Sequence, residues 1–565
     1  MHILGISCFY HDAAAALLRD GKLVAAAEEE RFSRRKHDFG WPGGAIAYCL
    51  REGDITINDV DHVVFYEKPI LKFERILSCY VSTWPASYVA FLKALPLWLK
   101  DRLWLRDHIQ KQLGTDHEIL FAEHHMSHAA SAFLVSPFEE ATVVTLDGVG
   151  EWTTTTLGWG RGSEIQLTRE IRFPHSLGLY YSAITAYLGF EVNDAEWKVM
   201  GLAPYGQLTQ VDKCRQLIRT QPDGSFALNM RYFAHHYSAQ RMFNRRFEKL
   251  FGRPQREPES DIGEFHQDVA RSGQHVFEEV AVNLVRAAHA MHPSDNLCLA
   301  GGCALNTVAN WKIMDQTPFK RLFVQPAAGD SGGAVGAAFY IYNTVLGQPR
   351  EFALRDVYLG PAFDESEMEW ALRDAGAQVR WETLPREELL QRTATALSQD
   401  KVIGWFQGRM EFGPRALGSR SILANPMNPE MKKIVNSKIK FREFFRPFAP
   451  AVLREHADEY FEMDGQDSPF MLLVPPVRAD KRAVIPAVTH ADGTGRVQTV
   501  TRETNELYYE VIRQFAALTG VPVLLNTSFN VRGEPIVCTP RDAVNCFLKT
   551  GLDYLVLGHS FVSKP

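Results

Sequence analysis

The sequence predicts an α/β protein built from a duplicated N-terminal domain and a second α/β domain. A chain of 565 residues is too long for a single hydrophobic core. A pattern of three strands followed by helical sequence occurs twice in the first half. A polar, loop-like stretch then separates that half from about 200 further residues, a normal domain size. We therefore expect domains at 1–350 and 364–565, joined by a linker at 351–363.

The first copy of the pattern lies at the N-terminus. The stretch ILGIS, the polar break FYHD, AAAALLRD, a turn at Gly21 and KLVAAAEEE predict strand, loop, strand, tight turn and strand. The second copy spans 142–168, with the acidic loop LDGVGE after its first strand. Such a repeat is expected of a domain that closes around a nucleotide. Neither copy contains GxxxxGK[ST], and the isolated GxG at Gly148–Gly150 is too weak to indicate a dinucleotide fold.

Two glycine-rich strand-to-helix turns follow the second copy. They are NLCLAGGCALN at 296–306 and RLFVQPAAGDSGGAVGAAFYIY at 321–342. Small residues at such a turn let backbone N–H groups approach an anion or a ribose. They equally allow tight helix packing, and the sequence leaves both interpretations open.

The composition is that of an ordinary globular protein, with 46% hydrophobic and 23% charged residues. The net charge of -6 offers no general attraction for nucleic acid or for an anionic membrane, so we expect neither as a partner. The N-terminus lacks a basic leader and its apolar run is broken by His11 and Asp12, which favours a cytoplasmic protein. Eight cysteines without a CxxC pair favour reduced thiols over a disulfide framework or a zinc ribbon.

Two segments of the first domain stand apart from the repeat. Residues 80–105 are rich in aromatic residues and leucine, but Lys93, Lys100 and Asp101 interrupt the run, so we favour buried helices over a membrane-surface or lipid-facing role. Residues 207–265 are expected to form an insertion. Its His235 and His236 are interpreted as surface or packing residues rather than metal ligands.

Three basic stretches of the second domain predict a phosphate site. They are GWFQGRMEFGPRALGSRSILANP at 404–426, NSKIKFREFFRPFAP at 436–450 and VPVLLNTSFNVRGEPIV at 521–537. Guanidinium groups bind phosphate oxygens bidentately, and the neighbouring aromatic residues exclude water. A single-stranded nucleic acid is the less favoured ligand because the chain is acidic overall.

The stretch AEHHMSHAASAF at 122–133 contains a candidate metal-binding pair. His124 and His128 are four residues apart, so on a helix they share one face and can bind the same metal ion. His125 points elsewhere. A histidine pair alone is more often explained by core or capping positions than by metal binding.

Ten stretches, in order, resemble one family. They are GISCFYHDAAAAL, AAEEERFSRRKHD, EHHMSHAASAF, TLDGVGEWTTT, EWKVMGLAPYG, LAGGCALN, GDSGGAVGAA, GRMEFGPRALGSRSILA, KFREFFRPFAP and LNTSFNVRGEPIV. Over nearly its whole length the chain resembles the NodU/CmcH carbamoyltransferases, which act in antibiotic and nodulation-factor biosynthesis. The resemblance implies an actin-like (ASKHA) N-terminal domain fused to a C-terminal domain similar to YrdC.

The resemblance also implies a two-step reaction. Carbamoyl phosphate and ATP, the latter with Mg²⁺, would form carbamoyl-adenylate and release pyrophosphate in the YrdC-like domain. The carbamoyl group would then pass to a hydroxyl of a small-molecule acceptor in the actin-like domain. Acceptor choice is expected to depend on the stretches 68–112 and 207–265.

By resemblance, His124, His128 and Asp330 are the ligands of an iron ion, although zinc or manganese would suit the same ligands. Asp330 has a second possible role as a helix N-cap. His11 matches the general base near the acceptor hydroxyl, and Asp12 would orient it or close an Asx turn.

The resemblance further assigns two groups of substrate-binding residues. The residues expected to bind nucleotide are Lys36, Asp147, Gly148, Glu151, Gly301, Gly302 and Asn306. The residues expected to bind carbamoyl phosphate are Arg415, Lys440, Arg442, Arg446, Asn526, Thr527 and Ser528.

Three other functions can be weighed from the sequence. A tRNA threonylcarbamoyl transferase would share the first domain and HxxxH, but the fused second domain and the lack of net positive charge disfavour it. A hydrogenase-maturation carbamoyl protein is disfavoured by the missing CxxC pairs. The alternative that is not an enzyme is a non-catalytic, nucleotide-sensing scaffold. A homodimer is the expected oligomeric state.

Overall fold

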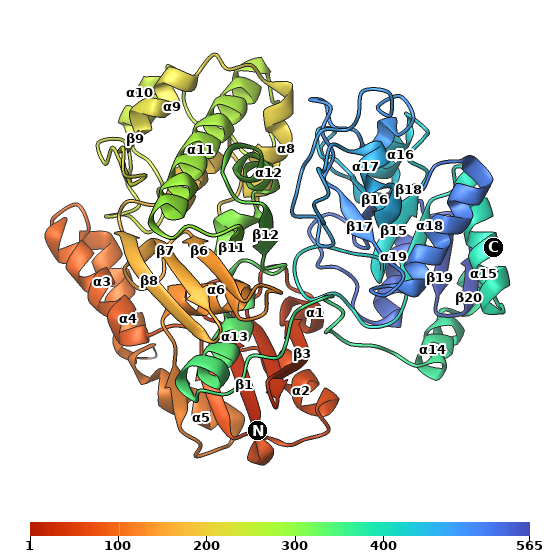
Figure 1. Cartoon of the computed structure of the whole chain (residues 1–565), viewed down its shortest axis with the longest axis horizontal. Helices are drawn as coiled ribbons and strands as arrows, with labels where there is room; N and C mark the ends of the chain where they lie inside the picture. The colour runs from red at the N-terminus through yellow and green to blue at the C-terminus, as the bar shows by residue number, and fades with distance from the viewer. Residues whose placement is uncertain (101) are drawn as a thin grey trace. The chain divides into compact units, whose positions relative to one another are not determined.

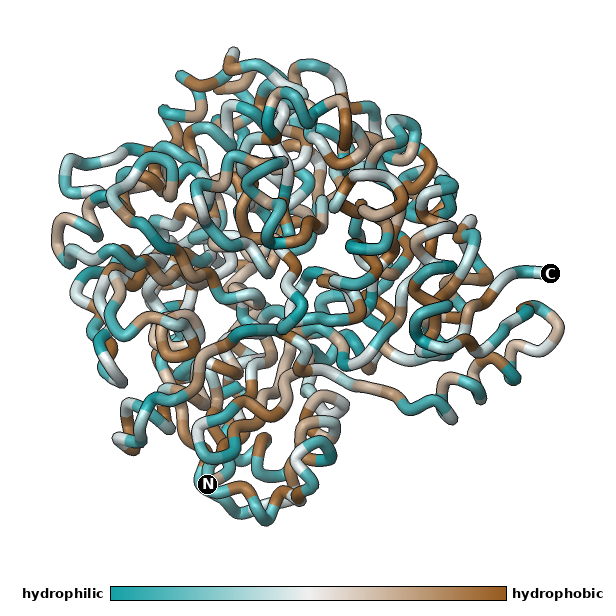
Figure 2. The backbone as a smooth tube through the Cα atoms, turned by 45° about the vertical axis from the view of Figure 1, so that its right-hand side comes forward, coloured by the Kyte–Doolittle hydropathy of each residue, from teal (hydrophilic) through white to brown (hydrophobic). Residues whose placement is uncertain are grey.

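The computed structural model describes residues 1–100 and 102–565, and the chain divides into two compact α/β units. Unit 1 comprises Met1–Glu29 and Phe39–Leu354, and unit 2 comprises Glu30–Asp38 and Arg355–Pro565 (Figure 1). The short segment 30–38, which nothing in the sequence separates from the first domain, therefore belongs to the C-terminal unit. Figure 2 shows hydrophobic residues concentrated along the inner elements and hydrophilic residues along the outer turns.

Unit 1 contains two five-stranded sheets of identical topology. The first has the order β3-β2-β1-β4-β5 and the second has the order β8-β7-β6-β11-β12. In each sheet the first three strands are antiparallel and the last two pair in parallel. The strands are β1 (His2–Ser7), β2 (Ala14–Arg19), β3 (Lys22–Glu28), β4 (His62–Phe65), β5 (Ile119–Phe121), β6 (Glu140–Leu146), β7 (Thr153–Arg161), β8 (Glu164–Arg172), β11 (Asn296–Ala300) and β12 (Arg321–Val324). The predicted duplication and the α/β class of this unit are confirmed.

Two helices fill the space between these sheets. Helix α13 (Asp330–Phe339) packs on β1 and β2, α6 (His124–Phe133) packs on β6 and β11, and the helices pack on each other (Figure 1). Glycines allow the close approach: a Cβ at Gly5 would lie 2.0 Å from the Ala334 carbonyl oxygen, and one at Gly336 would lie 1.8 Å from that of Ser127. The small residues at 332–338 therefore serve tight helix packing.

The outer faces of both sheets carry further helices. Helix α2 (Gly43–Glu52) covers β2 and β3, and the long α11 (Glu264–Met291) packs on β6. The remaining helices near the second sheet are α7 (Leu177–Tyr187), α8 (Glu196–Leu202) and α12 (Thr307–Gln316). Residues 207–265 form α9 (Val211–Leu217), the two-stranded sheet of β9 (Ile218–Thr220) and β10 (Phe226–Leu228), and α10 (Arg245–Phe251).

The aromatic segment at 80–105 differs from its prediction. It forms parts of α3 (Pro69–Ser82), α4 (Tyr88–Lys100) and a short turn, followed by α5 (Leu105–Leu113), while Asp101 lies outside the described residues. The prediction of buried helices is wrong for most of these side chains, since Val81, Trp84, Val89 and Trp104 are each more than half exposed. Trp98 and Ala90 are among the few apolar residues that α4 buries. No helix in the described parts of the chain is both long and apolar enough to cross a membrane.

Unit 2 is organised around one eight-stranded sheet. Its order is β13-β20-β19-β14-β15-β18-β16-β17. The strands are β13 (Arg380–Thr383), β14 (Ile403–Phe406), β15 (Arg420–Ala424), β16 (Ala449–Leu453), β17 (Gln498–Val500), β18 (Val523–Ser528), β19 (Tyr554–Leu557) and β20 (Ser560–Ser563). Helix α15 (Arg386–Ser398) packs on α18 (Glu506–Thr519), and α14 (Glu365–Ala375) packs on α19 (Pro540–Lys549).

The segment 30–38 is held in unit 2 by two arginines. Arg31, in the short helix α1 (Glu30–Ser33), is buried and donates to the Gly413 carbonyl at 2.9 Å. Arg34 donates to the Ile536 carbonyl at 2.7 Å and to the Pro535 carbonyl at 3.0 Å. These bonds join an N-terminal stretch to two distant loops of the C-terminal domain.

Candidate functional site

Four buried side chains of unit 1 converge on one point. His124 and His128 come from α6, Asp330 begins α13, and Asp147 follows β6 in the first loop of the second repeat. His124 Nε2 lies 3.1 Å from His128 Nε2, 3.1 Å from Asp147 Oδ2 and 3.7 Å from Asp330 Oδ1. His128 Nε2 lies 3.9 Å from Asp147 and 3.7 Å from Asp330. The structure therefore brings the three predicted metal ligands together and adds Asp147.

This geometry suits a divalent metal ion. Metal–nitrogen and metal–oxygen bonds of about 2.1 Å place neighbouring ligand atoms about 3.0–3.5 Å apart. The separations of the four atoms, 3.1 to 3.9 Å, overlap that range. The Nδ1 atoms of His124 and His128 are buried without a hydrogen-bond partner in the described chain, so both rings turn Nε2 toward the centre. Two imidazoles and two carboxylates suit Fe²⁺, Mn²⁺ or Zn²⁺, so the group could hold any of them.

The electrostatics of the group follow from burial and from the contacts among its members. Burial alone would lower the pKa of His124, but its hydrogen bond to Asp147 and the charge of Asp330 raise that pKa to about 9. Burial and the charge of His124 lower the pKa of His128 to about 3. Burial opposes ionisation of Asp147, yet its contact with His124 holds the pKa of this carboxyl well below its usual value. A proton on His124 thus balances Asp147, and a bound cation would replace that proton.

The start of α6 is fixed by Glu151 from the second hairpin. Its Oε1 accepts from the backbone N–H of His124 at 3.0 Å and from that of Lys68 at 2.8 Å. A carboxylate at a helix N-terminus is favourable, because the first N–H groups have no partner within the helix. Glu151 therefore orients the histidine helix, and its oxygens are already engaged.

His125 is held away from the metal group. Its Nε2 lies 2.9 Å from the Thr153 carbonyl and its Nδ1 lies 2.6 Å from Thr145 Oγ1. Burial and the neighbouring histidines lower the pKa of His125 to about 3, so the ring is neutral. This residue is a packed core histidine, as its position on the helix predicts.

Asp147 also connects the metal group to the glycine turn that follows β11. Its Oδ1 accepts from the backbone N–H of Gly302 at 2.8 Å. Gly301 has φ +92, and a Cβ there would lie 2.2 Å from the Leu146 carbonyl oxygen, so the turn requires glycine. Asn306 caps α12 and exchanges hydrogen bonds with Gln274, so its side chain is engaged. Gly148 has open space around its Cα.

The predicted base His11 lies in the first hairpin loop of unit 1. Its Nδ1 is 2.8 Å from Asp12 Oδ2, and its Nε2 is 2.6 Å from the Asn193 carbonyl oxygen. Each ring nitrogen therefore lies within hydrogen-bonding distance of an oxygen atom. A hydroxyl can give its proton to His11 only after Nε2 leaves Asn193. Lys36 is exposed and lies in segment 30–38 of unit 2.

Unit 2 contains a cluster of four arginines, one of which, Arg446, pairs with Glu443 at 3.6 Å. Burial, followed by the charges of Arg415, Arg442 and Arg446, lowers the pKa of Arg496 well below its usual value. Burial lowers the pKa of Arg415 to about 10. The buried Nε atoms of Arg415 and Arg496 have no hydrogen-bond partner among the residues that the structure describes. We call Arg415, Arg442, Arg446 and Arg496 the arginine cluster; such a group is completed by an oxyanion.

The loop that carries Arg415 is fixed by a buried carboxylate. Glu411 Oε1 accepts from the backbone N–H groups of Leu417, Ser419 and Arg420, at 2.7, 2.7 and 3.1 Å. The other arginines of this loop have structural partners: Arg420 donates to the Gln407 and Pro361 carbonyls, and Arg409 to the Leu359 carbonyl. This distinction separates Arg415 from its neighbours in sequence.

Four other predicted phosphate ligands lie in or near the loop that follows β18. Lys440 is buried, and its Nζ donates to Asn530 Oδ1 at 2.7 Å and to Ser528 Oγ at 3.2 Å, so it holds the loop after β18. Asn526 donates to Gln498 Oε1 at 2.9 Å, while its own Oδ1 is buried and unpartnered within the described chain. Thr527 and Ser528 are half-buried at the end of β18.

Sequence reasoning missed two contributions to these groups. Asp147 was expected to contact nucleotide, and only the fold places its carboxylate against His124. Arg496 lies in the stretch RVQTV, which resembles no phosphate-binding sequence motif. One local signal could have indicated Arg496 as a site residue. Arg496 and Gln498 are two apart in an extended stretch, so they point to the same face, and the Gln498 side chain accepts from Asn526.

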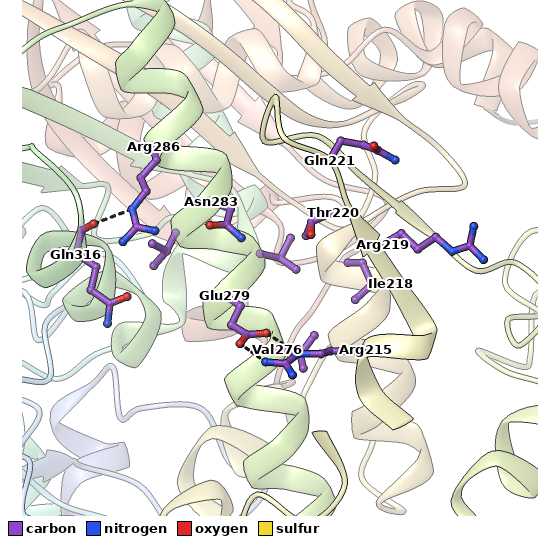
Figure 3. A pocket seen from close by; sticks show the side chains of 12 residues that line it. Arg215, Ile218, Arg219, Thr220, Gln221, Val276, Glu279, Asn283, Arg286 and Gln316 are labelled. Atoms are coloured by element: carbon purple, nitrogen blue, oxygen red, sulfur yellow. Dashed lines mark hydrogen bonds and ion pairs between the residues drawn. The ribbon is translucent and has the colours of Figure 1, made fainter. Parts of the chain in front are cut away.

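A cavity of unit 1 lies away from both of these groups. It has a volume of about 590 Å³ and opens between the insertion and α11 (Figure 3). Its charged residues satisfy one another: Arg215 Nη2 lies 2.6 Å from Glu279 Oε1, and Arg286 donates to the Gln316 carbonyl at 2.9 Å. It contains none of the predicted site residues, so we do not assign the chemistry to it.

Comparison with known proteins identifies the family. The family model described as Carbamoyltransferase N-terminus matches residues 2–339, and that described as Carbamoyltransferase C-terminus matches residues 394–564. The chain is 39% identical to nodulation protein NolNO of Sinorhizobium fredii, over 98% of this chain and 79% of that protein. It is 31% identical to nodulation protein U of Rhizobium tropici, over 94% and 92% of the two chains.

Further similarities are to an uncharacterised protein of Synechocystis sp. and to solved structures. The Synechocystis protein is 47% identical over all of this chain and 97% of its own length. The structure of HypF from T. kodakarensis has 16% identity and a TM-score of 0.32, over 61% of this chain and 48% of its own. The ROK hexokinase of Thermus thermophilus has 13% identity and a TM-score of 0.29, over 60% and 98%. On the family matches and the nodulation-protein relatives, the chain belongs to the carbamoyltransferase family and is a carbamoyltransferase enzyme.

Proposed function

We propose that this carbamoyltransferase is ATP-dependent and transfers a carbamoyl group to a hydroxyl of a small-molecule acceptor. In the first step carbamoyl phosphate, ATP and water yield carbamoyl-adenylate, inorganic phosphate and pyrophosphate. In the second step the acceptor oxygen attacks the carbamoyl carbon, AMP leaves with the bonding electrons, and the hydroxyl loses its proton. The arginine cluster is the observation that carries this proposal, because its positive charge needs a compact anion such as carbamoyl phosphate.

Within unit 2, Arg415 and Arg496 would bind phosphate oxygens directly. Their Nε atoms are buried and unpartnered in the described structure, whereas Arg442 Nε already donates to Asn436 Oδ1 at 2.7 Å. Asn526 would accept from the carbamoyl amide through its unpartnered Oδ1. Lys440 would act indirectly by holding the loop that contains Ser528 and Asn530.

Within unit 1, the metal group would serve the transfer step. A divalent ion bound by His124, His128, Asp147 and Asp330 would neutralise phosphate oxygens of the adenylate. Gly301 and Gly302 would let backbone approach the nucleotide closely. His11 would accept the hydroxyl proton at Nε2 after release from Asn193, while Asp12 holds Nδ1. Iron is our preferred metal on the family resemblance alone.

Pyrophosphate release from ATP and carbamoyl phosphate tests the first step. We expect Arg496→Met to raise the KM for carbamoyl phosphate about 10- to 100-fold, the loss typical of a charged hydrogen bond. Carbamoyl-adenylate should be detectable by mass spectrometry with the wild-type protein. The matched control is Arg541→Met, because Arg541 is an exposed arginine of unit 2 that pairs with Asp374 and stacks on Trp370. An unchanged KM in Arg496→Met would contradict the proposal.

A further inference from the structure

Helix α3 places two cationic side chains in the interior of unit 1. Lys72 and Arg75 are only 5% and 6% exposed, although Ile70 on the same helix is 71% exposed. Residues three apart lie on one helix face. The inner face of α3 is therefore basic while part of its outer face is apolar, which is the reverse of an ordinary amphipathic helix.

Lys72 is neutralised by a neighbouring acid. Its Nζ lies 2.6 Å from Glu67 Oε2 and 4.3 Å from the centre of the Tyr10 ring. The same Glu67 oxygen lies 3.9 Å from Nδ1 of the metal-group residue His124. The inner face of α3 therefore adjoins the metal group.

Arg75 has no such partner. It makes no hydrogen bond or ion pair with any residue in 1–100 or 102–565, and its Nε is fully enclosed. Its guanidinium lies 5.0 Å from the centre of the Phe173 ring. The nearby acids are engaged elsewhere, Glu67 with Lys72 and Glu151 with the backbone of Lys68 and His124. A largely buried guanidinium whose enclosed Nε has no partner among the described residues is unfavourable, and an oxyanion would relieve it.

The surroundings of Arg75 indicate which substrate would bring that oxyanion. Phe173 follows β8, and its ring also packs edge-on against His235 of the insertion, with centroids 5.7 Å apart. Phe173 thus links Arg75 of α3 to His235 of the insertion, and these are the two segments expected to select the acceptor. Tyr10, whose ring centre lies 4.3 Å from Lys72 Nζ on the same helix, directly precedes the predicted base His11.

We propose that Arg75 binds a carboxylate, phosphate or sulfate group carried by the hydroxyl acceptor. This inference rests on the proposed carbamoyl transfer and narrows its acceptor class to anionic alcohols. The planar guanidinium can hold two oxygens at once while its face rests on Phe173. The phosphates of the nucleotide are the other source of the same chemistry.

Thermal unfolding of the full chain in sulfate-free buffer and with added sulfate tests the oxyanion site. We expect Arg75→Met to unfold at a higher temperature than wild type without sulfate, by about 3 °C or more, because an unpaired buried charge is removed. Sulfate should then raise the wild-type Tm more than that of the variant. Arg253→Met is the matched control, because Arg253 is exposed and stacks on Phe265 at 4.4 Å, so it reports the general effect of sulfate. A less stable Arg75→Met with an unchanged sulfate response would overturn the proposal.

Calorimetric titration with ATP distinguishes the two sources of the oxyanion. An acceptor role predicts that the Kd of ATP changes less than twofold in Arg75→Met. A tenfold weaker Kd would assign Arg75 to the nucleotide and overturn the acceptor assignment. Neither measurement requires turnover, so a wild-type protein that releases no pyrophosphate would refute the proposed function and leave the test of Arg75 intact.

Discussion

At the scale of single residues, three histidines within five positions have two different roles. His124 and His128 turn Nε2 toward Asp147 and Asp330, whereas His125 is bonded to Thr145 and the Thr153 carbonyl. The difference follows from helical geometry, since only residues four apart share a face. The same sequence stretch therefore supplies its own control for metal binding.

We expect His128→Asn to lose the metal and His125→Asn to retain it. Removal of a ligand should weaken affinity by more than about 100-fold, beyond the range typical of changes to residues that only support ligands. Metal content after dialysis against Fe²⁺, Mn²⁺ or Zn²⁺ measures this, with circular dichroism to verify folding. Equal metal content in the two variants would rule out this group as the metal site.

At the scale of secondary-structure elements, the contact between α13 and α6 builds the metal group. Asp330 is the first residue of α13, and its Oδ2 also accepts from Tyr66 at 3.3 Å, so the position of this helix sets that of the ligand. The contact depends on glycine, because a Cβ at Gly336 would lie 1.8 Å from a backbone oxygen of α6. A backbone oxygen within a helix cannot move aside as a flexible side chain can.

Gly336→Ala should therefore lower the free energy of unfolding by about 1–3 kcal/mol, which is typical of overpacking in a core. Gly263→Ala is the matched change, because Gly263 has open space within 4 Å and precedes α11. It should cost about 0.5 kcal/mol or less. Urea unfolding followed by circular dichroism compares the two, and equal losses would contradict the packing argument.

At the scale of the whole molecule, the two structural units do not correspond to two continuous stretches of the sequence. Segment 30–38 is encoded near the N-terminus but is bonded into unit 2 through Arg31 and Arg34. A fragment consisting only of residues 355–565 would leave the Gly413, Pro535 and Ile536 carbonyls without these donors. Buried or half-buried carbonyls that lose partners destabilise a fold.

A fragment 355–565 with residues 30–38 attached through a flexible linker should unfold at a higher temperature than the fragment alone, by about 4 °C or more. The attached segment restores the arginine bonds and buries Arg31. Differential scanning calorimetry measures the shift. Attachment of the same segment with Arg31→Ala and Arg34→Ala should give little of it, and an equal gain would show that the arginines are not responsible.

What the sequence by itself determined is local or repetitive. Periodicity and composition act over a few neighbouring residues, so they can be recognised in the sequence. They indicate the two three-strand patterns, the shared face of His124 and His128, and the basic stretches around Arg415 and Arg446. The same reasoning left the glycine-rich helix start at 329–338 undecided between two interpretations, because both require small side chains.

Only the tertiary structure decided which distant groups meet. Asp147 joins His124, Arg496 joins Arg415, and Arg75 is buried without a partner although its helix is otherwise largely exposed. It also decided that the apolar side chains of Trp84 and Val89 are exposed, and that segment 30–38 belongs to unit 2. These outcomes depend on contacts between residues far apart in the chain, and local propensity carries no information about which distant surface will cover a given side chain.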